Sequence, residues 1–209
     1  MRIRREGFSC FARYAQRKAM ATSLPSAAPD AQDDDALMHR VAARDAQAFG
    51  ILADRHGERC YRIAWRMLGD GTEAQDVAQE AMLRLWQNAG NWRGGGPGAG
   101  AWLTRVSTNL SLDRLRQRAR ISGEEVPERA DETPLADAAM EGEQECLAVI
   151  RALDLLPERQ RAAIVLTYYE ELSNADAAQV LEMNIKAFES LLLRARRALR
   201  DMLVENEDG

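Results

Sequence analysis

Hydrophobic residues recur at helical spacing in the first half of the chain, where apolar side chains fall every three or four residues from 46 to 68. Asp45 precedes this stretch in the position of a helix cap, and the Gly-Asp-Gly segment at 69–71 follows it. A long helix is therefore predicted over 46–68. Three aspartates at 33–35 place negative charge where a first turn favours it, which predicts a shorter helix through Arg44.

A third helix, with sides of different character, is predicted from 72 to about 88. Thr72 and Gln75 have the spacing of a capping box, which predicts where this helix starts. One side is lined by Val77, Ala81, Leu85 and Asn88. The other sides carry Asp76, Gln79, Glu80 and Arg84. Three large apolar residues, Met82, Leu83 and Trp86, are divided between core and surface.

A glycine-rich segment separates this helix from the next. Glycines at 94, 95, 96, 98 and 100, together with Pro97, predict a loop that cannot hold a helix. The helix after the loop has an apolar stripe for a core at Trp102, Leu103, Val106 and Leu110. Beside it runs a polar row of Arg105, Asn109, Asp113 and Arg116. Taken alone, Trp102 fits a core position better than a stacking platform.

Residues 121–145 change the character of the chain. Nine acids stand against the single Arg129, and two prolines interrupt a segment without a sustained apolar period. We interpret 121–142 as a flexible acidic linker between two domains. Its default role is that of a solvated spacer, and shielding of the neighbouring basic helix from non-specific DNA is an alternative.

Helices return after the linker in the order of a helix-turn-helix. They are expected over about 143–155, through 162–169, and over 174–181, the last capped by Ser173. A break at 182–184 precedes a long final helix at 185–203. A short helix, a tight turn and a longer helix are typical of a DNA-binding motif. A three-helix scaffold with a solvated basic face has the same pattern.

The final helix has two distinct faces. The residues expected to pack inward are Ile185, Phe188, Leu192, Ala195 and Leu199. The residues expected to face away are Lys186, Glu189, Ser190, Leu193 and Arg197. In a helix-turn-helix the start of the second helix enters the major groove, and we assign phosphate contacts to Arg194 and Arg197 further along.

Composition is that of an ordinary globular protein. The 209 residues are 46% hydrophobic and 29% charged, with a net charge of -5. No apolar run approaches the length that crosses a bilayer, and three scattered cysteines favour a reducing cytoplasm over a disulfide framework. The predicted fold class is all-α, with two small helical domains at 33–120 and 143–204 joined by the linker.

Both ends of the chain are predicted to lie outside these domains. Arginines interrupt the basic opening before the apolar core of a signal peptide can form, and a segment rich in proline, alanine and serine follows Met20. We interpret 1–32 as a disordered N-terminal extension, for which translation from an upstream start codon is one origin. A basic arm that contacts DNA is the alternative. Residues 205–209 form a short tail.

Charge segregation points to an anionic partner. Between 92 and 120 six arginines stand against the single acid Asp113, in a chain whose net charge is negative. Arginine holds phosphates through its planar fork, and asparagine can bond a base edge, so this combination favours nucleic acid. The alternative is a solvated face on an ordinary helix.

Candidates for metal or catalytic chemistry are weak. His56 and Cys60 stand four residues apart on the first long helix, but a metal site needs three or four ligands, and His39 is the chain's other histidine. No convergent carboxylates stand at a spacing that favours a hydrolase or nuclease. We therefore predict no metal, no cofactor and no enzymatic activity.

Four stretches taken together resemble a known family. They read DVAQEAMLRLW at 76–86, WLTRVSTN at 102–109, LLPERQR at 155–161 and RARRALR at 194–200. In order and spacing they are similar to the extracytoplasmic-function (ECF) group of bacterial sigma-70 factors, over about 46–203. The resemblance implies a first domain that reads the promoter -10 element, a second that reads the -35 element, and a chain that directs core RNA polymerase to start sites.

The resemblance also implies roles for individual residues. Contacts to the -10 element are expected from Arg93, Trp102, Arg105, Asn109, Arg114 and Arg116. Contacts to the -35 element are expected from Lys186, Glu189, Ser190, Arg194 and Arg197. Docking on the beta-prime clamp helices of the polymerase is expected from Asp76, Gln79 and Glu80. The implied partners are core polymerase, through its clamp helices and beta flap, promoter DNA and an anti-sigma factor, without membrane insertion.

Three residues depart from the family pattern. Glu182 stands where the turn of the second domain usually has glycine, and a left-handed backbone there costs about 1 kcal/mol for another residue. Glu189 and Leu191 stand where lysine and arginine are frequent, which alters the expected -35 contacts. The rival function is a conventional helix-turn-helix regulator that binds operators and senses a ligand with its first domain.

Overall fold

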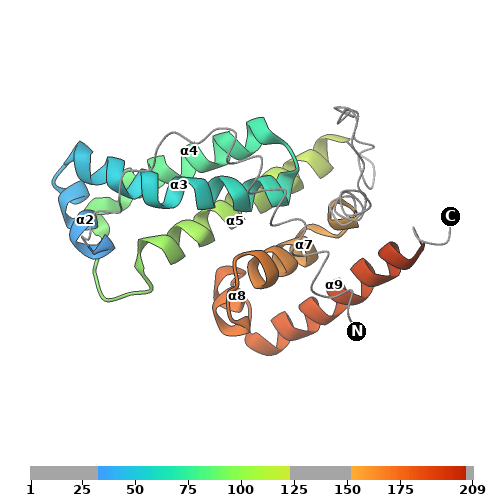
Figure 1. Ribbon diagram of the computed structural model, residues 1–209. Helices are drawn as coiled ribbons and strands as arrows, with labels where there is room; N and C mark the ends of the chain where they lie inside the picture. The colour runs from blue at the N-terminus through green and yellow to red at the C-terminus, as the bar shows by residue number, and fades with distance from the viewer. Residues whose placement is uncertain (1–32, 123–151, 206–209) are drawn as a thin grey trace, which may run out of the picture. The chain divides into compact units, whose positions relative to one another are not determined.

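The computed structural model describes residues 33–122 and 152–205. Within those ranges every regular element is a helix, so the predicted all-α class is confirmed (Figure 1). The chain divides into two compact units, one built mainly from α2 to α5 and the other mainly from α7 to α9. The N-terminal extension, nearly all of the linker and the tail beyond Glu205 fall outside the described residues, and these assignments stay predictions.

The first unit contains four α-helices and a short 3-10 turn. They are α2 (Asp34–Ala42), α3 (Ala46–Leu68), α4 (Gly71–Asn88), η1 (Ala89–Asn91) and α5 (Gly98–Ser122). α3 and α4 pack against each other, and α2 packs across α3 and η1. Each contributes an apolar face to one core, whose fully buried side chains include Leu37, Leu52, Ile63, Leu85 and Leu103.

The helix caps show which sequence signals decided the boundaries. Asp45 caps α3 as predicted, because its carboxylate accepts from Gln47 N and Ala48 N. The capping box predicted at Thr72 is wrong. Asp70 is the cap of α4, since its carboxylate accepts from Glu73 N at 2.9 Å and the helix then begins one residue earlier than Thr72.

α5 begins inside the glycine-rich segment, which corrects the prediction that these glycines exclude a helix. Gly98, with φ of 83°, opens the first turn. A Cβ at Gly100 would lie 3.1 Å from His56 Cε1, so a glycine lets α5 approach α3 closely. At the other end α5 continues to Ser122, two residues into the predicted linker.

The buried face of α5 is more polar than its predicted apolar stripe. Leu103 and Leu110 are buried, but Trp102 and Val106 are only half-buried. Four hydroxyl residues share the buried face, namely Thr104, Ser107, Thr108 and Ser111. Three of these hydroxyls donate to the carbonyl one turn earlier, at 2.8 to 2.9 Å, so they enter the core with their donors satisfied.

The second unit contains the helix-turn-helix. Its helices are α7 (Glu158–Ile164), the π-helical turn η2 (Val165–Tyr169), α8 (Asn174–Val180) and α9 (Ile185–Glu205). α7 packs against α9 around the fully buried ring of Phe188. Ser173 caps α8 as predicted, because its hydroxyl accepts from Asp176 N. Asn184 caps α9 by accepting from Ala187 N at 2.8 Å.

The turn between α8 and α9 explains two sequence features. Glu182 has φ of 52°, so the left-handed backbone expected at this position is present without a glycine. Ile185, expected to pack inward, is 45% exposed. It is the first residue of α9, and the inward face becomes buried only at Phe188, one turn later.

Replacing Glu182 by glycine is expected to stabilise the second unit. The comparison variant is Glu182→Ala, because both changes delete the side chain and only glycine relieves the left-handed strain. Glu182→Gly should exceed Glu182→Ala in unfolding free energy by about 1 kcal/mol. Chemical denaturation of the two variants measures the difference, and equal stabilities would show that the turn is unstrained.

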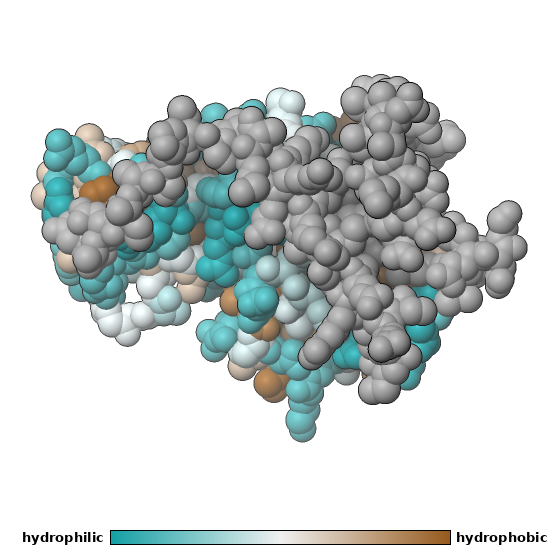
Figure 2. Space-filling view, viewed as in Figure 1, coloured by the Kyte–Doolittle hydropathy of each residue, from teal (hydrophilic) through white to brown (hydrophobic). Residues whose placement is uncertain are grey.

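The described surface is mainly hydrophilic, as expected for a chain in which 29% of the residues are charged. Most of the coloured surface in Figure 2 is hydrophilic, and hydrophobic residues form small separate patches. Among helices in the described ranges, none has the length and apolar character to span a membrane.

Candidate nucleic-acid interface

A pocket opens in the first unit where η1 and the glycine-rich loop meet α5. Its volume is about 320 Å³, at the small end of the range for ligand pockets. It is lined by Met38, Leu85, Asn88, Asn91, Trp92, Arg93, Gly96, Pro97, Gly98 and Trp102. The lining combines two indole rings, two amides and one guanidinium. These groups suit a flat heterocycle with polar edges that is attached to a negatively charged backbone.

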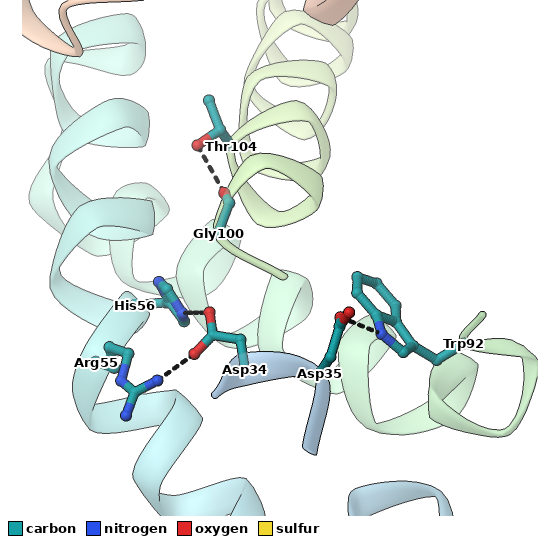
Figure 3. Close-up of polar contacts among 7 residues, drawn as sticks. All are labelled: Asp34, Asp35, Arg55, His56, Trp92, Gly100 and Thr104. Atoms are coloured by element: carbon teal, nitrogen blue, oxygen red, sulfur yellow. Dashed lines mark hydrogen bonds and ion pairs between the residues drawn. The ribbon is translucent and has the colours of Figure 1, made fainter. Parts of the chain in front are cut away.

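The loop wall of the pocket is attached to α2. Asp35 accepts from Trp92 Nε1 at 2.9 Å (Figure 3), and it also accepts from Gly95 N at 3.0 Å. The hydrogen bond from Gly95, then the one from Trp92, lowers the pKa of the Asp35 carboxyl below its ordinary value, with a smaller contribution from His39. Asp35 therefore holds the loop as a carboxylate.

The neighbouring residue of α2 is attached to α3. Asp34 forms an ion pair with Arg55, and its other oxygen lies 2.6 Å from His56 Nε2 (Figure 3). Within the described ranges, no group of three or more histidine, cysteine or acidic residues is arranged to hold a metal. His56 thus has a structural contact with α2, and Cys60, the other member of the weak metal candidate, is buried.

The predicted -10 residues do not all lie in one place. Arg93 and Trp102 line the pocket, whereas Asn109 is not among its lining residues. Asn109 comes seven positions after Trp102, which puts it on the same face of α5 about 10 Å further along the axis. Arg105 is exposed and Arg116 half-buried on that face. The face therefore continues from the pocket along α5.

Arg114 lies on a different side of α5 from this polar row. Its guanidinium is 3.6 Å from the Asp76 carboxylate and 3.5 Å from the Glu73 carbonyl oxygen, both on α4. Arg114 is predicted to contact DNA and Asp76 to bind polymerase, and in the structure these two side chains lie next to each other as an ion pair. Asp113, not Arg114, follows Asn109 at helical spacing, and that spacing could have separated Arg114 from the row.

The outer face of α4 carries the predicted docking residues. Asp76 and Gln79 are exposed, and Glu80 is half-exposed and receives a 2.8 Å hydrogen bond from Arg84 one turn later. Leu83 falls among them at helical spacing and is 48% exposed. A single exposed leucine is normal on a protein surface, so Leu83 adds apolar area to the predicted docking face without identifying it. The sequence left Leu83 unassigned between core and surface.

The outer face of α9 carries the predicted -35 residues. Lys186, Glu189, Ser190, Arg194 and Arg197 are all exposed. Leu193, between them, is 48% exposed, as predicted. Leu191, which stands where lysine or arginine was expected from the resemblance, is 7% exposed and packs in the core. Glu189 is therefore the accessible one of the two unusual residues.

Two pocket residues were missed in the sequence. Asn88 and Asn91 line the pocket, where their amides resemble the groups that bond base edges. Asn88 was assigned to an apolar side of its helix, but it is exposed and donates to the Arg84 carbonyl at 2.8 Å. The pocket forms only when η1 and the loop fold back on α5, which helical periodicity does not reveal.

Comparison with known families gives two matches. The pattern of sigma-70 region 2 matches residues 52–121, and that of sigma-70 region 4 matches residues 146–199. The first match includes α4, the pocket loop and α5. The second includes the helix-turn-helix.

Curated relatives carry the same two regions. The chain is 30% identical to ECF RNA polymerase sigma factor SigK of Mycobacterium bovis, over 82% of this chain and 94% of that protein. It is 29% identical to SigW of Bacillus subtilis, over 78% and 93%. With SigE of Mycolicibacterium smegmatis it shares 36% identity over 74% of this chain and 61% of that longer protein.

Solved structures show a similar fold. CnrH, solved in complex with the cytosolic domain of CnrY, matches with a TM-score of 0.60 and 28% identity, over 82% of this chain and 97% of CnrH. RpoE of Bartonella quintana, solved with the anti-sigma factor NepR, matches with a TM-score of 0.55 over 70% and 91%, and at 22% identity this supports the fold alone.

Proposed function

Because the chain belongs to the ECF group of RNA polymerase sigma factors, we propose that it binds core RNA polymerase and directs transcription initiation by reading two promoter elements. The first unit reads the -10 element and the second the -35 element. The observation that carries this assignment is the pocket of two indoles, two amides and Arg93 beside the polar face of α5. The proposed role needs no catalytic step by this chain, and we place it in the cytoplasm with the polymerase.

The pocket is proposed to receive one unpaired base of the -10 element. Extruding a base from the duplex costs a few kcal/mol, and stacking on an aromatic ring returns about 1–3 kcal/mol. Trp92 and Trp102 offer aromatic surface, and the amides of Asn88 and Asn91 offer donors and acceptors to the base edge. Arg93, at the exposed rim, is suited to the adjoining phosphate.

Asn109 is proposed to contact a second base. Its distance from Trp102 along α5 is longer than the separation of neighbouring stacked bases, about 3.4 Å. A strand following the face of α5 from the pocket would therefore present a different nucleotide to Asn109. Arg105 and Arg116 on the same face would hold the phosphates between and beyond these bases.

The outer face of α9 is proposed to enter the major groove of the -35 element. Lys186, Glu189 and Ser190 lie in the first two turns of α9, where base contacts are made in this motif. Glu189 can accept from the N4 amino group of cytosine. Arg194 and Arg197 lie further along and are assigned to phosphates.

Two protein partners complete the proposal. The outer face of α4, with Asp76, Gln79, Glu80 and the exposed Leu83, is assigned to the beta-prime clamp helices, and the second unit to the beta flap. CnrH and the Bartonella RpoE were each solved with a further protein, the latter an anti-sigma factor. We propose that an anti-sigma factor also restrains this chain.

Run-off transcription with purified core polymerase tests the proposed function. Adding the chain to core polymerase and genomic fragments should produce discrete transcripts whose start sites share two upstream elements. A conventional regulator would neither form a stoichiometric complex with core polymerase nor support initiation from it. Absence of both the complex and the transcripts would overturn the proposal.

A further inference from the structure

Asp35 connects α2 to two points of the pocket loop that are three residues apart. One carboxylate oxygen accepts from the Trp92 indole and the other from the Gly95 backbone, across 57 and 60 residues of sequence. The carboxylate thereby closes a ring that contains the backbone from Trp92 to Gly95. Arg93, at the pocket rim, lies within that ring.

The loop needs such an attachment because its own residues pack loosely. A Cβ added at Gly95 or Gly96 would meet no atom within 4 Å, so these glycines are surrounded by open space. Glycine also has more backbone freedom to lose than any other residue. Hydrogen bonds to a carboxylate are roughly twice as strong as neutral ones, and two of them fix the loop and the plane of Trp92.

The attachment is itself fixed at its other end. Asp34, next to Asp35, is bound to Arg55 and lies 2.6 Å from His56 on α3 (Figure 3). Gly100, in the first turn of α5, approaches the other side of the His56 ring. α2 therefore joins α3 and the pocket loop in one frame.

Gly94 shows that the loop is fitted to this carboxylate. A Cβ at Gly94 would lie 2.9 Å from the Asp35 Oδ2 atom that accepts from Gly95, so a larger residue would displace that oxygen. Gly94 does not have a left-handed backbone. Close approach to Asp35, and not backbone conformation, is therefore the reason for glycine here.

We propose that Asp35 is a positioning residue for promoter recognition, which holds Trp92 and the 92–97 loop in the conformation that lets the pocket discriminate between bases. This inference rests on the proposed reading of an unpaired base by the pocket. Asp35 is outside the lining residues and acts through Trp92 and Gly95. Its loss should reduce selectivity at one promoter position without weakening polymerase binding.

Asp35→Asn is the sharpest test. Asparagine keeps the size of the side chain, but the two donors bond different oxygens of Asp35, so in the same orientation the amide NH2 would face one of the two donors. The matched control is Asp33→Asn, which removes the same charge from the exposed N-cap position of α2, where no side-chain cap bond is made. Both variants are assembled with core polymerase as full chains.

The measurement is competitive binding of promoter probes whose -10 segment is already unpaired, with every base tested at every position. Wild type and Asp33→Asn should prefer one base at the pocket position, and Asp35→Asn should reduce that preference about fivefold. Equal affinities of the three holoenzymes for a probe with a duplex -35 element alone would show intact assembly.

A second pair of variants covers the case in which Asp35→Asn does not fold. Gly94→Ala keeps the carboxylate but pushes it away, and Gly90→Ala adds the same methyl group where nothing lies within 4 Å. Gly94→Ala should lose selectivity and Gly90→Ala should keep it. Wild-type selectivity retained in both Asp35→Asn and Gly94→Ala would overturn this inference alone. A wild type without any base preference would overturn the proposed -10 reading, and this inference with it.

Discussion

Reversing Asp76 and Glu80 to arginine is expected to weaken binding to core polymerase by at least about tenfold, because a face that presents carboxylates is expected to meet complementary positive charge on its partner. The helical content and the unfolding midpoint should stay close to wild type. Both carboxylates are on the outer face of α4, and their contacts with Arg114 and Arg84 are surface ion pairs of small energetic value. Titration of labelled polymerase with each variant measures the affinity.

A matched control exists on α3. Glu58 is exposed and pairs with Arg62 four residues later, as Glu80 pairs with Arg84 on α4. Glu58→Arg makes the same change in the same helical geometry away from the proposed docking face. It should bind polymerase as wild type does. A comparable loss in Glu58→Arg and Glu80→Arg would mean that net charge, and not the face of α4, determines the affinity.

A Leu83 variant distinguishes the apolar contribution to polymerase binding from the electrostatic contribution. Leu83→Ala should weaken polymerase binding by an amount that changes little with salt, because burial of an exposed leucine is not screened. The loss caused by charge reversal should shrink as the salt concentration rises. If Leu83→Ala binds normally, the docking surface lies elsewhere on α4.

Helical periodicity and capping residues were sufficient to predict most of the fold. Asp45, Gly69 and Ser173 end or begin helices where predicted, because each acts through backbone groups within a few residues of itself. The capping box at Thr72 did not form because Asp70 caps the helix two residues earlier, where its carboxylate accepts from Glu73 N, and Thr72 then lies inside the first turn of α4. The choice between such neighbouring caps is decided by local geometry.

The buried face of α5 was predicted less well, since apolar character was taken as the sign of burial. Thr104, Thr108 and Ser111 are buried because their hydroxyls bond to the preceding turn, and small side chains fill the space there. Trp102 consequently stays half-buried at the pocket. The five glycines just before Trp102 in the sequence were the feature that could have indicated a residue lining the pocket and not a core residue.

The candidate site could be predicted only in part for a different reason. Arg93 and Trp102 were assigned from the family resemblance, in a segment whose arginines favour an anionic partner. The conformation of the pocket loop depends on Asp35, whose carboxylate bonds to Trp92 from a position 57 residues earlier in the sequence. A single sequence carries no signal of that pairing, because any of three consecutive aspartates satisfies the first turn of α2 equally well.

Trp102→Ala and Asn109→Ala are expected to affect different positions of the -10 element. Loss of stacking at the pocket should cost about 1–3 kcal/mol, and loss of a bidentate amide contact should cost a similar amount. Because Asn109 lies about 10 Å along α5 from Trp102, the base whose identity matters to Asn109 should be a different one. A binding scan over every base at every position, with unpaired probes and each holoenzyme, measures both effects.

Arg116→Ala is the contrasting variant in the same scan. A phosphate contact carries no sequence information, so this change should weaken all probes equally and reduce the salt dependence of binding by about one counterion. Asn109→Ala should instead flatten the profile at one position and leave the salt dependence unchanged. A uniform loss in Asn109→Ala would remove its base-reading role. Coincident positions for Trp102 and Asn109 would show that both contact one base, which the separation along α5 disfavours.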